Sequence, residues 1–173
     1  VRLQRDRRAI GRTFAGGADP GLLVHIDTAL SDPHHGRRRV AVLWFESGLR
    51  IVYKPRGIAV EAAFGQLLAW LNEGLEAPLR ILRTLDCETH GWAEHAASAP
   101  AFGLDEAVRY FRRAGALMCV TSVLGARDLH RDNLVAAAGG PVLFLRPLLS
   151  RSRLPSLGVT GIEPRPWNPP EHS

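Results

Sequence analysis

The sequence has no run of about 18 apolar residues, the length that a transmembrane helix needs. Residues 1–5 are charged and contain no apolar stretch, so they do not form a signal peptide. Two cysteines, Cys87 and Cys119, are too few for a disulfide framework or a cysteine-based zinc site. These absences predict a chain without a membrane span and with a cytoplasmic location.

Lysine is almost absent, because Lys54 is the one lysine among 22 basic residues. An ammonium is a compact point charge, whereas a guanidinium is a broad planar fork. A chain that otherwise uses arginine and keeps one lysine therefore indicates a site that needs an ammonium, although chance retention is the alternative. The formal charge of +5 fits a phosphate-bearing partner. Aromatic and basic residues are not interleaved, which argues against nucleic acid as a binding partner.

A length of 173 residues is enough for one domain with a core. Apolar periodicity and turn residues predict the following helices and strands in chain order. They are a helix over 2–14, a strand over 22–26, a hairpin of 39–45 and 49–54, a helix over 60–72, a strand over 80–85 and a helix over 104–125. This order predicts an α+β fold in which Lys54 ends the second strand of the hairpin.

Both later helices have an apolar face. In the helix over 60–72, the residues predicted to face the sheet are Phe64, Leu67, Leu68 and Leu71. In the helix over 104–125, the residues predicted to lie in the core are Val108, Phe111, Gly115, Met118 and Leu124. Glu61 could pair with Lys54, or it could be an acid in the first helical turn, where the helix dipole favours it. We prefer the second interpretation.

The loop over 127–133 has the spacing of a phosphotransferase site. Asp128 and Asn133 stand five residues apart, as do the catalytic aspartate and the metal-binding asparagine of kinases. The alternative triplet, with Asp132 as the base, fails because Ala137 stands five residues after it. The alternative is that this loop is a solvated acidic turn with no catalytic role.

Six motifs give the chain a family resemblance. They are residues 31–34 (SDPH), 52–56 (VYKPR), 64–72 with its LAWLN end, 89–92 (THGW), 110–115 (YFRRAG) and 128–134 (DLHRDNL). Their order and spacing over residues 2–143 resemble the dehydratase domain of class II lanthipeptide synthetases (LanM-type lantibiotic biosynthesis proteins). The resemblance implies a lipid-kinase-like core with a sheet lobe and a helical lobe, of which this chain holds an incomplete copy.

The family resemblance also implies a reaction. Enzymes of this family phosphorylate serines and threonines of a leader-bearing precursor peptide with ATP and Mg²⁺, and they then eliminate the phosphate to give dehydroamino acids. Carried over by position, Lys54 binds phosphate, Asp128 activates the substrate hydroxyl, His130 supports Asp128 and Asn133 binds the metal. The zinc cyclase domain of the family is absent from this sequence.

Asp32 and His34 stand two residues apart, so an extended segment places both on one face. The resemblance puts them near the phosphates. An ordinary Asp-Pro turn is the alternative.

The family pattern breaks near residue 144. Leu145 and Pro147 stand where the family has a metal-binding aspartate and a glutamate, and neither side chain can bind Mg²⁺. Six of the twelve prolines lie in residues 145–173, a composition that predicts a disordered or out-of-frame tail. We therefore expect residues 1–144 to be a partial dehydratase domain and the chain to be a truncated remnant without full activity. A chain that begins with valine agrees with a piece of a longer protein.

Other functions remain open at this point. A small aminoglycoside- or lipid-kinase relative would need the missing metal acid. A pseudokinase-like module that binds nucleotide or leader peptide without catalysis would not need it. An unstable fragment would aggregate through the apolar surface that its missing parts should cover.

Overall fold

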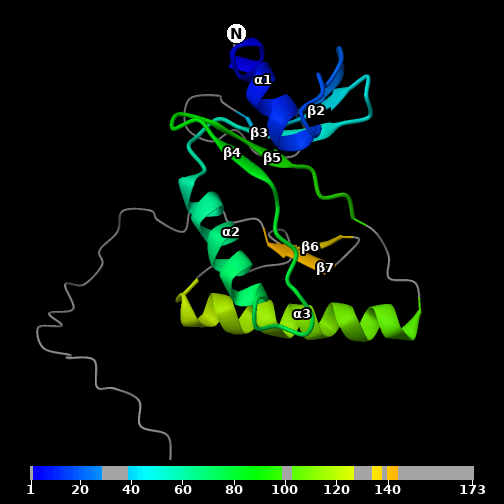
Figure 1. The fold of residues 1–173 in the computed structure, drawn as a ribbon, viewed down its shortest axis with the longest axis vertical. Helices are drawn as coiled ribbons and strands as arrows, with labels where there is room; N and C mark the ends of the chain where they lie inside the picture. The colour runs from blue at the N-terminus through cyan, green and yellow to red at the C-terminus, as the bar shows by residue number, and fades with distance from the viewer. Residues whose placement is uncertain (1, 29–38, 99–102, 127–133, 138–139, 144–173) are drawn as a thin grey trace, which may run out of the picture.

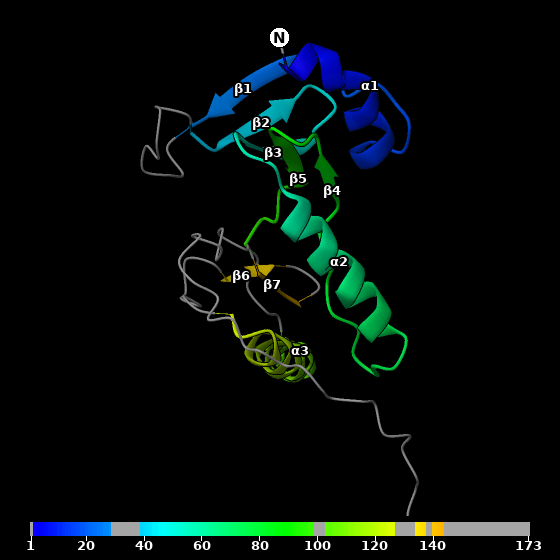
Figure 2. The same cartoon turned by 90° about the vertical axis from the view of Figure 1, so that its left-hand side faces the viewer.

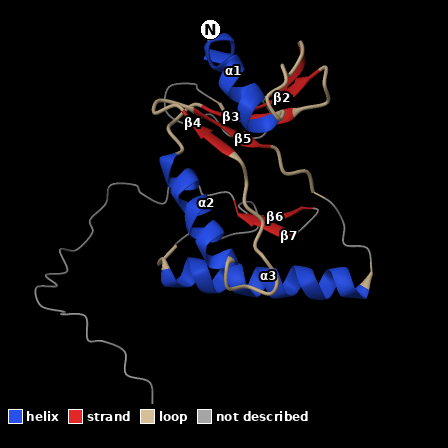
Figure 3. Ribbon diagram, in the orientation of Figure 1, coloured by secondary structure: helices blue, strands red, loops and turns tan. Residues whose placement is uncertain are grey.

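The computed structural model describes residues 2–28, 39–98, 103–126, 134–137 and 140–143 (Figure 1). Figure 3 colours the helices and strands of these ranges. In chain order they are α1 (Arg2–Phe14), β1 (Leu23–Asp27), β2 (Ala41–Phe45), β3 (Arg50–Lys54), α2 (Ala59–Asn72), β4 (Thr84–Asp86), β5 (Gly91–Glu94), α3 (Leu104–Val123), β6 (Leu134–Ala137) and β7 (Gly140–Leu143).

The strands form two antiparallel sheets. The larger sheet has the order β1-β2-β3-β5-β4, and β6 pairs with β7 in a second, two-stranded sheet. Figures 1 and 2 place α1 against the five-stranded sheet, with α3 at the far side of the molecule and β6–β7 between them. Helices and antiparallel sheets thus confirm the α+β class.

One face of the five-stranded sheet packs against α1. Alternate residues of a strand point to the same face, and Leu43, Phe45 and Ile51 form a buried cluster with Ile10 and Phe14 of the helix. The helix is rich in arginine, but these two apolar residues, four apart, lie on one side of it. Burial of this apolar surface anchors the N-terminal helix.

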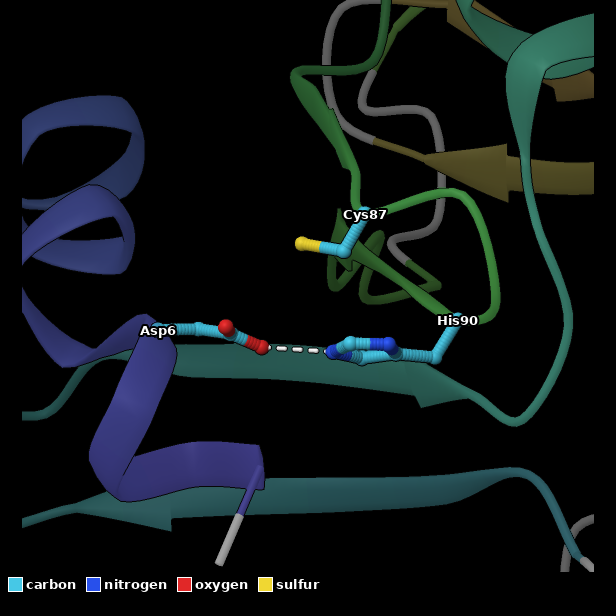
Figure 4. Close-up of side chains that lie close together, drawn as sticks. All are labelled: Asp6, Cys87 and His90. Carbon is cyan, nitrogen blue, oxygen red and sulfur yellow. Dashed lines mark hydrogen bonds and ion pairs between the residues drawn. The ribbon is translucent and has the colours of Figure 1, made fainter.

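A buried polar contact adds to this packing. Asp6 of α1 accepts a hydrogen bond from His90 Nε2 at 2.6 Å (Figure 4). It accepts another from Trp92 Nε1 at 3.0 Å. Burial alone would raise the pKa of Asp6, but the hydrogen bonds from His90 and Trp92 outweigh it and lower this pKa below the usual value. The carboxylate therefore ties the first helix to the segment leading into β5.

The apolar face of α2 is only partly as predicted. Leu68 packs in a cluster with Leu79 and Leu117, and Phe64 and Leu71 lie at its edge. Leu68 therefore packs toward α3 and the segment that follows α2, whereas we expected this face to meet the sheet, although α2 also lies in contact with β4 of that sheet. The periodicity identified which residues are inside but not which partner they meet.

The predicted core face of α3 is wrong. Phe111 and Met118 are 71% and 68% exposed, Val108 and Leu124 are exposed as well, and the buried residues are Leu117 and Thr121. Apolar residues occur on more than one side of this helix, so periodicity alone could not select the buried side.

The hairpin and the N-terminal helix are confirmed, whereas two strands of the larger sheet differ from the prediction. The strand expected over 80–85 is β4, which begins only at Thr84. β5 was not predicted as a strand, yet it pairs with β3 on one side and β4 on the other. None of the described helices is long and apolar enough to cross a membrane.

We predict that Asp6→Asn lowers the free energy of unfolding by about 3 kcal/mol at neutral pH, because it removes one partner of a buried charged network. The folded pKa of Asp6 is depressed, so its stabilising effect is present above the usual value of 3.8 and is lost as the pH falls through the lowered pKa. Urea unfolding of both proteins from pH 7 to about pH 3 should show the difference shrinking with acid.

Asp19→Asn is the matched control, since Asp19 bonds Arg7 at the surface. We expect it to change stability little and to show a weaker pH trend of the same sign, because bonds from Arg7 and from the Gly21 N–H lower the pKa of this exposed carboxyl as well. Equal losses in the two variants would contradict the role given to Asp6.

Candidate functional site

The site is built around Lys54, which ends β3. Its backbone lies opposite Gly91 of β5, and Val52, two residues earlier, shares its face of the sheet. This is the face opposite α1. The Lys54 side chain is only 9% exposed, which is rare for an ammonium unless an anion compensates it.

The compensating anion is Glu61, in the first turn of α2. Two contacts fix where this helix begins. The Ile58 backbone N–H donates to Asp86 Oδ1 at 2.8 Å, and the Ile58 side chain packs so closely on Gly91 that a Cβ there would lie 2.3 Å from it. The start of α2, and with it Glu61, is thus held beside the end of β3.

Glu61 is shared by two cations. Its Oε1 lies 3.1 Å from Lys54 Nζ and 2.7 Å from Arg56 NH2. The carboxylate side chain is 10% exposed, whereas the arginine is 35% exposed. Our preference for Glu61 as only a first-turn acid was therefore incomplete, because it occupies that turn and also pairs with Lys54.

Burial has the largest influence on Lys54. It lowers the pKa of the ammonium, the charge of Glu61 offsets part of this effect, and the nearby Arg56 lowers the pKa further. The site therefore holds a cation that is poorly hydrated, a state in which a further anion would interact strongly with it.

Apolar groups adjoin this cation. Val42, Val52 and Ala93 form a buried row across β2, β3 and β5, because each lies opposite the next in register. Ala93, Lys54 and Glu61 also line a cavity of about 30 Å³, room for about two water molecules. A larger ligand could enter only if the surrounding side chains moved.

Most predicted site residues cannot be placed. Asp32, His34, Asp128, His130 and Asn133 all lie outside the described residues. Their roles, and their proximity to Lys54, stay predictions.

Sequence reasoning missed Arg56 and the apolar row. Arg56 stands within the VYKPR motif, but nothing in its local pattern indicates a bond to a residue five positions later. The row had a partial signal, since strand alternation puts Val52 on the face of Lys54. Ala93 lacked a signal because β5 was not predicted.

A second polar cluster has atoms of metal-ligand type. One ligand atom from each of Asp6, Cys87 and His90 lies within 4.8 Å of the others (Figure 4). Burial raises the pKa of the Cys87 thiol, which disfavours the thiolate that a metal or a nucleophilic reaction requires. Asp6 already accepts from His90 and Trp92, so the cluster is satisfied as a hydrogen-bond network without an ion.

Comparison with known proteins gives two matches. A family described as a domain of unknown function (DUF4135) matches residues 1–144. The Lactococcus lactis subsp. lactis protein described as "Lacticin 481/lactococcin biosynthesis protein LcnDR2" is 26% identical over 122 residues, which cover 65% of this chain and 13% of that protein. The chain thus spans a small part of the length of this relative.

We predict that Glu61→Gln destabilises the fold more than Lys54→Met does. Loss of the carboxylate removes the anion that Lys54 and Arg56 share, and the buried lysine loses its short contact with it, at a cost of about 3 kcal/mol. Loss of the ammonium leaves Glu61 paired with Arg56, and we expect a cost of about 1 kcal/mol. Urea unfolding of the three proteins measures both values.

Glu76→Gln, at an exposed position after α2, controls for the loss of one acid. The reverse order of the two main variants would show that Lys54, and not Glu61, is the group on which this contact depends.

Proposed function

The chain belongs to the DUF4135 family, which is associated with class II lanthipeptide synthetases, and we propose that it acts in lantibiotic biosynthesis as the nucleotide-binding part of a kinase-like dehydratase. The observation that supports this function best is Lys54, the one lysine of the chain, held nearly buried by Glu61. A lysine on a strand of an antiparallel sheet, paired with a helical glutamate, is the arrangement by which protein kinases hold ATP.

The described residues fit a nucleotide in their chemistry. The Lys54 ammonium can donate to phosphate oxygens, and Glu61 fixes the direction from which it does so. The apolar row of Val42, Val52 and Ala93 suits the base of a nucleotide. These residues are buried, so the side chains that cover them would have to move to admit it. ATP with Mg²⁺, when bound, would supply the phosphoryl group.

The substrate would be a leader-bearing precursor peptide. This part of the proposal comes from the family and from the relative named for lacticin 481 and lactococcin biosynthesis. In the peptide-modifying reaction, Asp128 would activate the substrate hydroxyl with His130 beside it, and Asn133 would hold Mg²⁺. Asp32 and His34 would lie near the phosphates.

The sequence retains the lysine proposed to bind nucleotide but lacks acids that phosphoryl transfer requires. Leu145 and Pro147 occupy the positions of the metal acids in the family pattern, so the isolated chain should bind nucleotide without transferring phosphate. This favours the pseudokinase-like alternative for the chain by itself.

We predict that the chain binds Mg-ATP and that Lys54→Met weakens this binding about tenfold or more, the loss of a charge-assisted hydrogen bond to phosphate. Isothermal titration calorimetry measures both dissociation constants. Arg8→Met is the control, because it removes one exposed positive charge from α1, on the opposite face of the sheet. Equal affinity in Lys54→Met and the parent chain would refute nucleotide binding at this site.

We also expect no phosphopeptide when the chain is incubated with Mg-ATP and a serine- and threonine-containing precursor peptide. Mass spectrometry detects the added phosphate directly. Its appearance would show that other residues replace the missing metal acids.

A further inference from the structure

The contact between Lys54 and Glu61 limits how the lysine can bind a phosphate. Glu61 is buried to the same degree as Lys54, and the two side chains lie in contact at 3.1 Å. A lysine that also donates to a phosphate compensates this carboxylate less. A buried carboxylate that is poorly compensated is destabilising, so phosphate binding is opposed unless another cation remains.

Arg56 is positioned to be that cation. Its NH2 group makes the shorter of the two contacts with Glu61 Oε1, at 2.7 Å, and its NH1 group donates to the Gly57 backbone oxygen at 3.0 Å. The second bond fixes the guanidinium at the loop between β3 and α2. The planar fork can therefore keep Glu61 paired whatever the position of the flexible lysine stem.

We propose that Arg56 is a positioning residue that keeps Glu61 compensated while the Lys54 ammonium is shared between the carboxylate and a phosphate. The inference rests on the proposed nucleotide-binding function and adds to it how the lysine is made available. Arg56 acts through Glu61 and does not itself need to contact the ligand.

Several charged groups surround Lys54 among the described residues. Glu61 faces it from α2, Arg56 from the connection before α2, and Arg80, from the segment before β4, lines the same cavity. Arg80 is bonded to Glu94 at 2.8 Å, and Arg83 bonds that carboxylate at 3.1 Å. The chain thus provides a matched pair of shared carboxylates, of which one contacts Lys54 and the other does not.

The experiment uses the single lysine as a reporter. Trace acylation of the full chain with acetic anhydride, followed by mass spectrometry of the Lys54 peptide, gives the reactivity of one buried amine at each pH. Removal of the Arg56 charge by Arg56→Gln leaves Glu61 to Lys54 alone and removes a repulsion. We expect labelling near about pH 8.5 to slow by a factor of about three or more, because more of the amine is protonated.

Arg56→Lys should restore the parent profile of Lys54, since it returns a cation. Fragment ions that separate position 54 from position 56 are read in this variant, because the substitution adds a second amine to the peptide. Arg83→Gln, which removes the corresponding arginine from Glu94, should leave the profile of Lys54 unchanged. A profile in Arg56→Gln that matches that of Arg83→Gln would overturn the inference. Circular dichroism of each variant checks that the fold is retained, and Arg56→Lys provides the comparison if the glutamine variant is unfolded.

Mg-ATP affinity separates this inference from the proposed function. We expect Arg56→Gln to bind Mg-ATP several-fold more weakly than the parent and Arg83→Gln to bind it equally well. Full affinity in Arg56→Gln would overturn the role given to Arg56 while leaving nucleotide binding intact. Absence of binding in the parent chain would instead overturn the proposed function together with that role.

Discussion

A carboxylate that leaves water must be compensated by donors, and this constraint organises the described structure. Glu61 accepts from two cations, Asp6 accepts from His90 and Trp92, and Glu94 accepts from two arginines. In each case these donors come from outside the element that holds the acid, and Asp6 accepts in addition from Arg5 of its own helix. The cost of an unpaired buried charge therefore fixes how these elements sit relative to one another.

These contacts connect the parts of the molecule in sequence. Asp6 joins α1 to the turn before β5, and Asp86, at the end of β4, holds the start of α2 through the Ile58 N–H. Glu61 then joins α2 back to β3. The position of Lys54 thus depends on a chain of short polar contacts, and apolar packing on either side of the sheet supplies the rest.

The sequence predicted what local patterns can encode. Alternation in 39–45 and 49–54 gave the hairpin, and the single lysine directed attention to Lys54. Contacts between distant residues had no such signal, since Asp6 and His90 are 84 positions apart. β5 was missed because four residues that begin with glycine are too few to show a period, although this strand lies inside the sheet.

The remaining difference between the prediction and the structure concerns which side of α3 is exposed. α3 is apolar on more than one side, and the side that the heptad-like spacing favoured is the exposed one, with Phe111 and Met118 outward. A helix of this kind can be buried on either side, so its packing is decided by the neighbouring elements and not by its own sequence. Lys54 and the predicted loop residues likewise differ in what can be concluded about them. A buried cation and its counterion can be established from the described elements alone, whereas phosphoryl transfer also requires the acids and the amide to be brought to the same point.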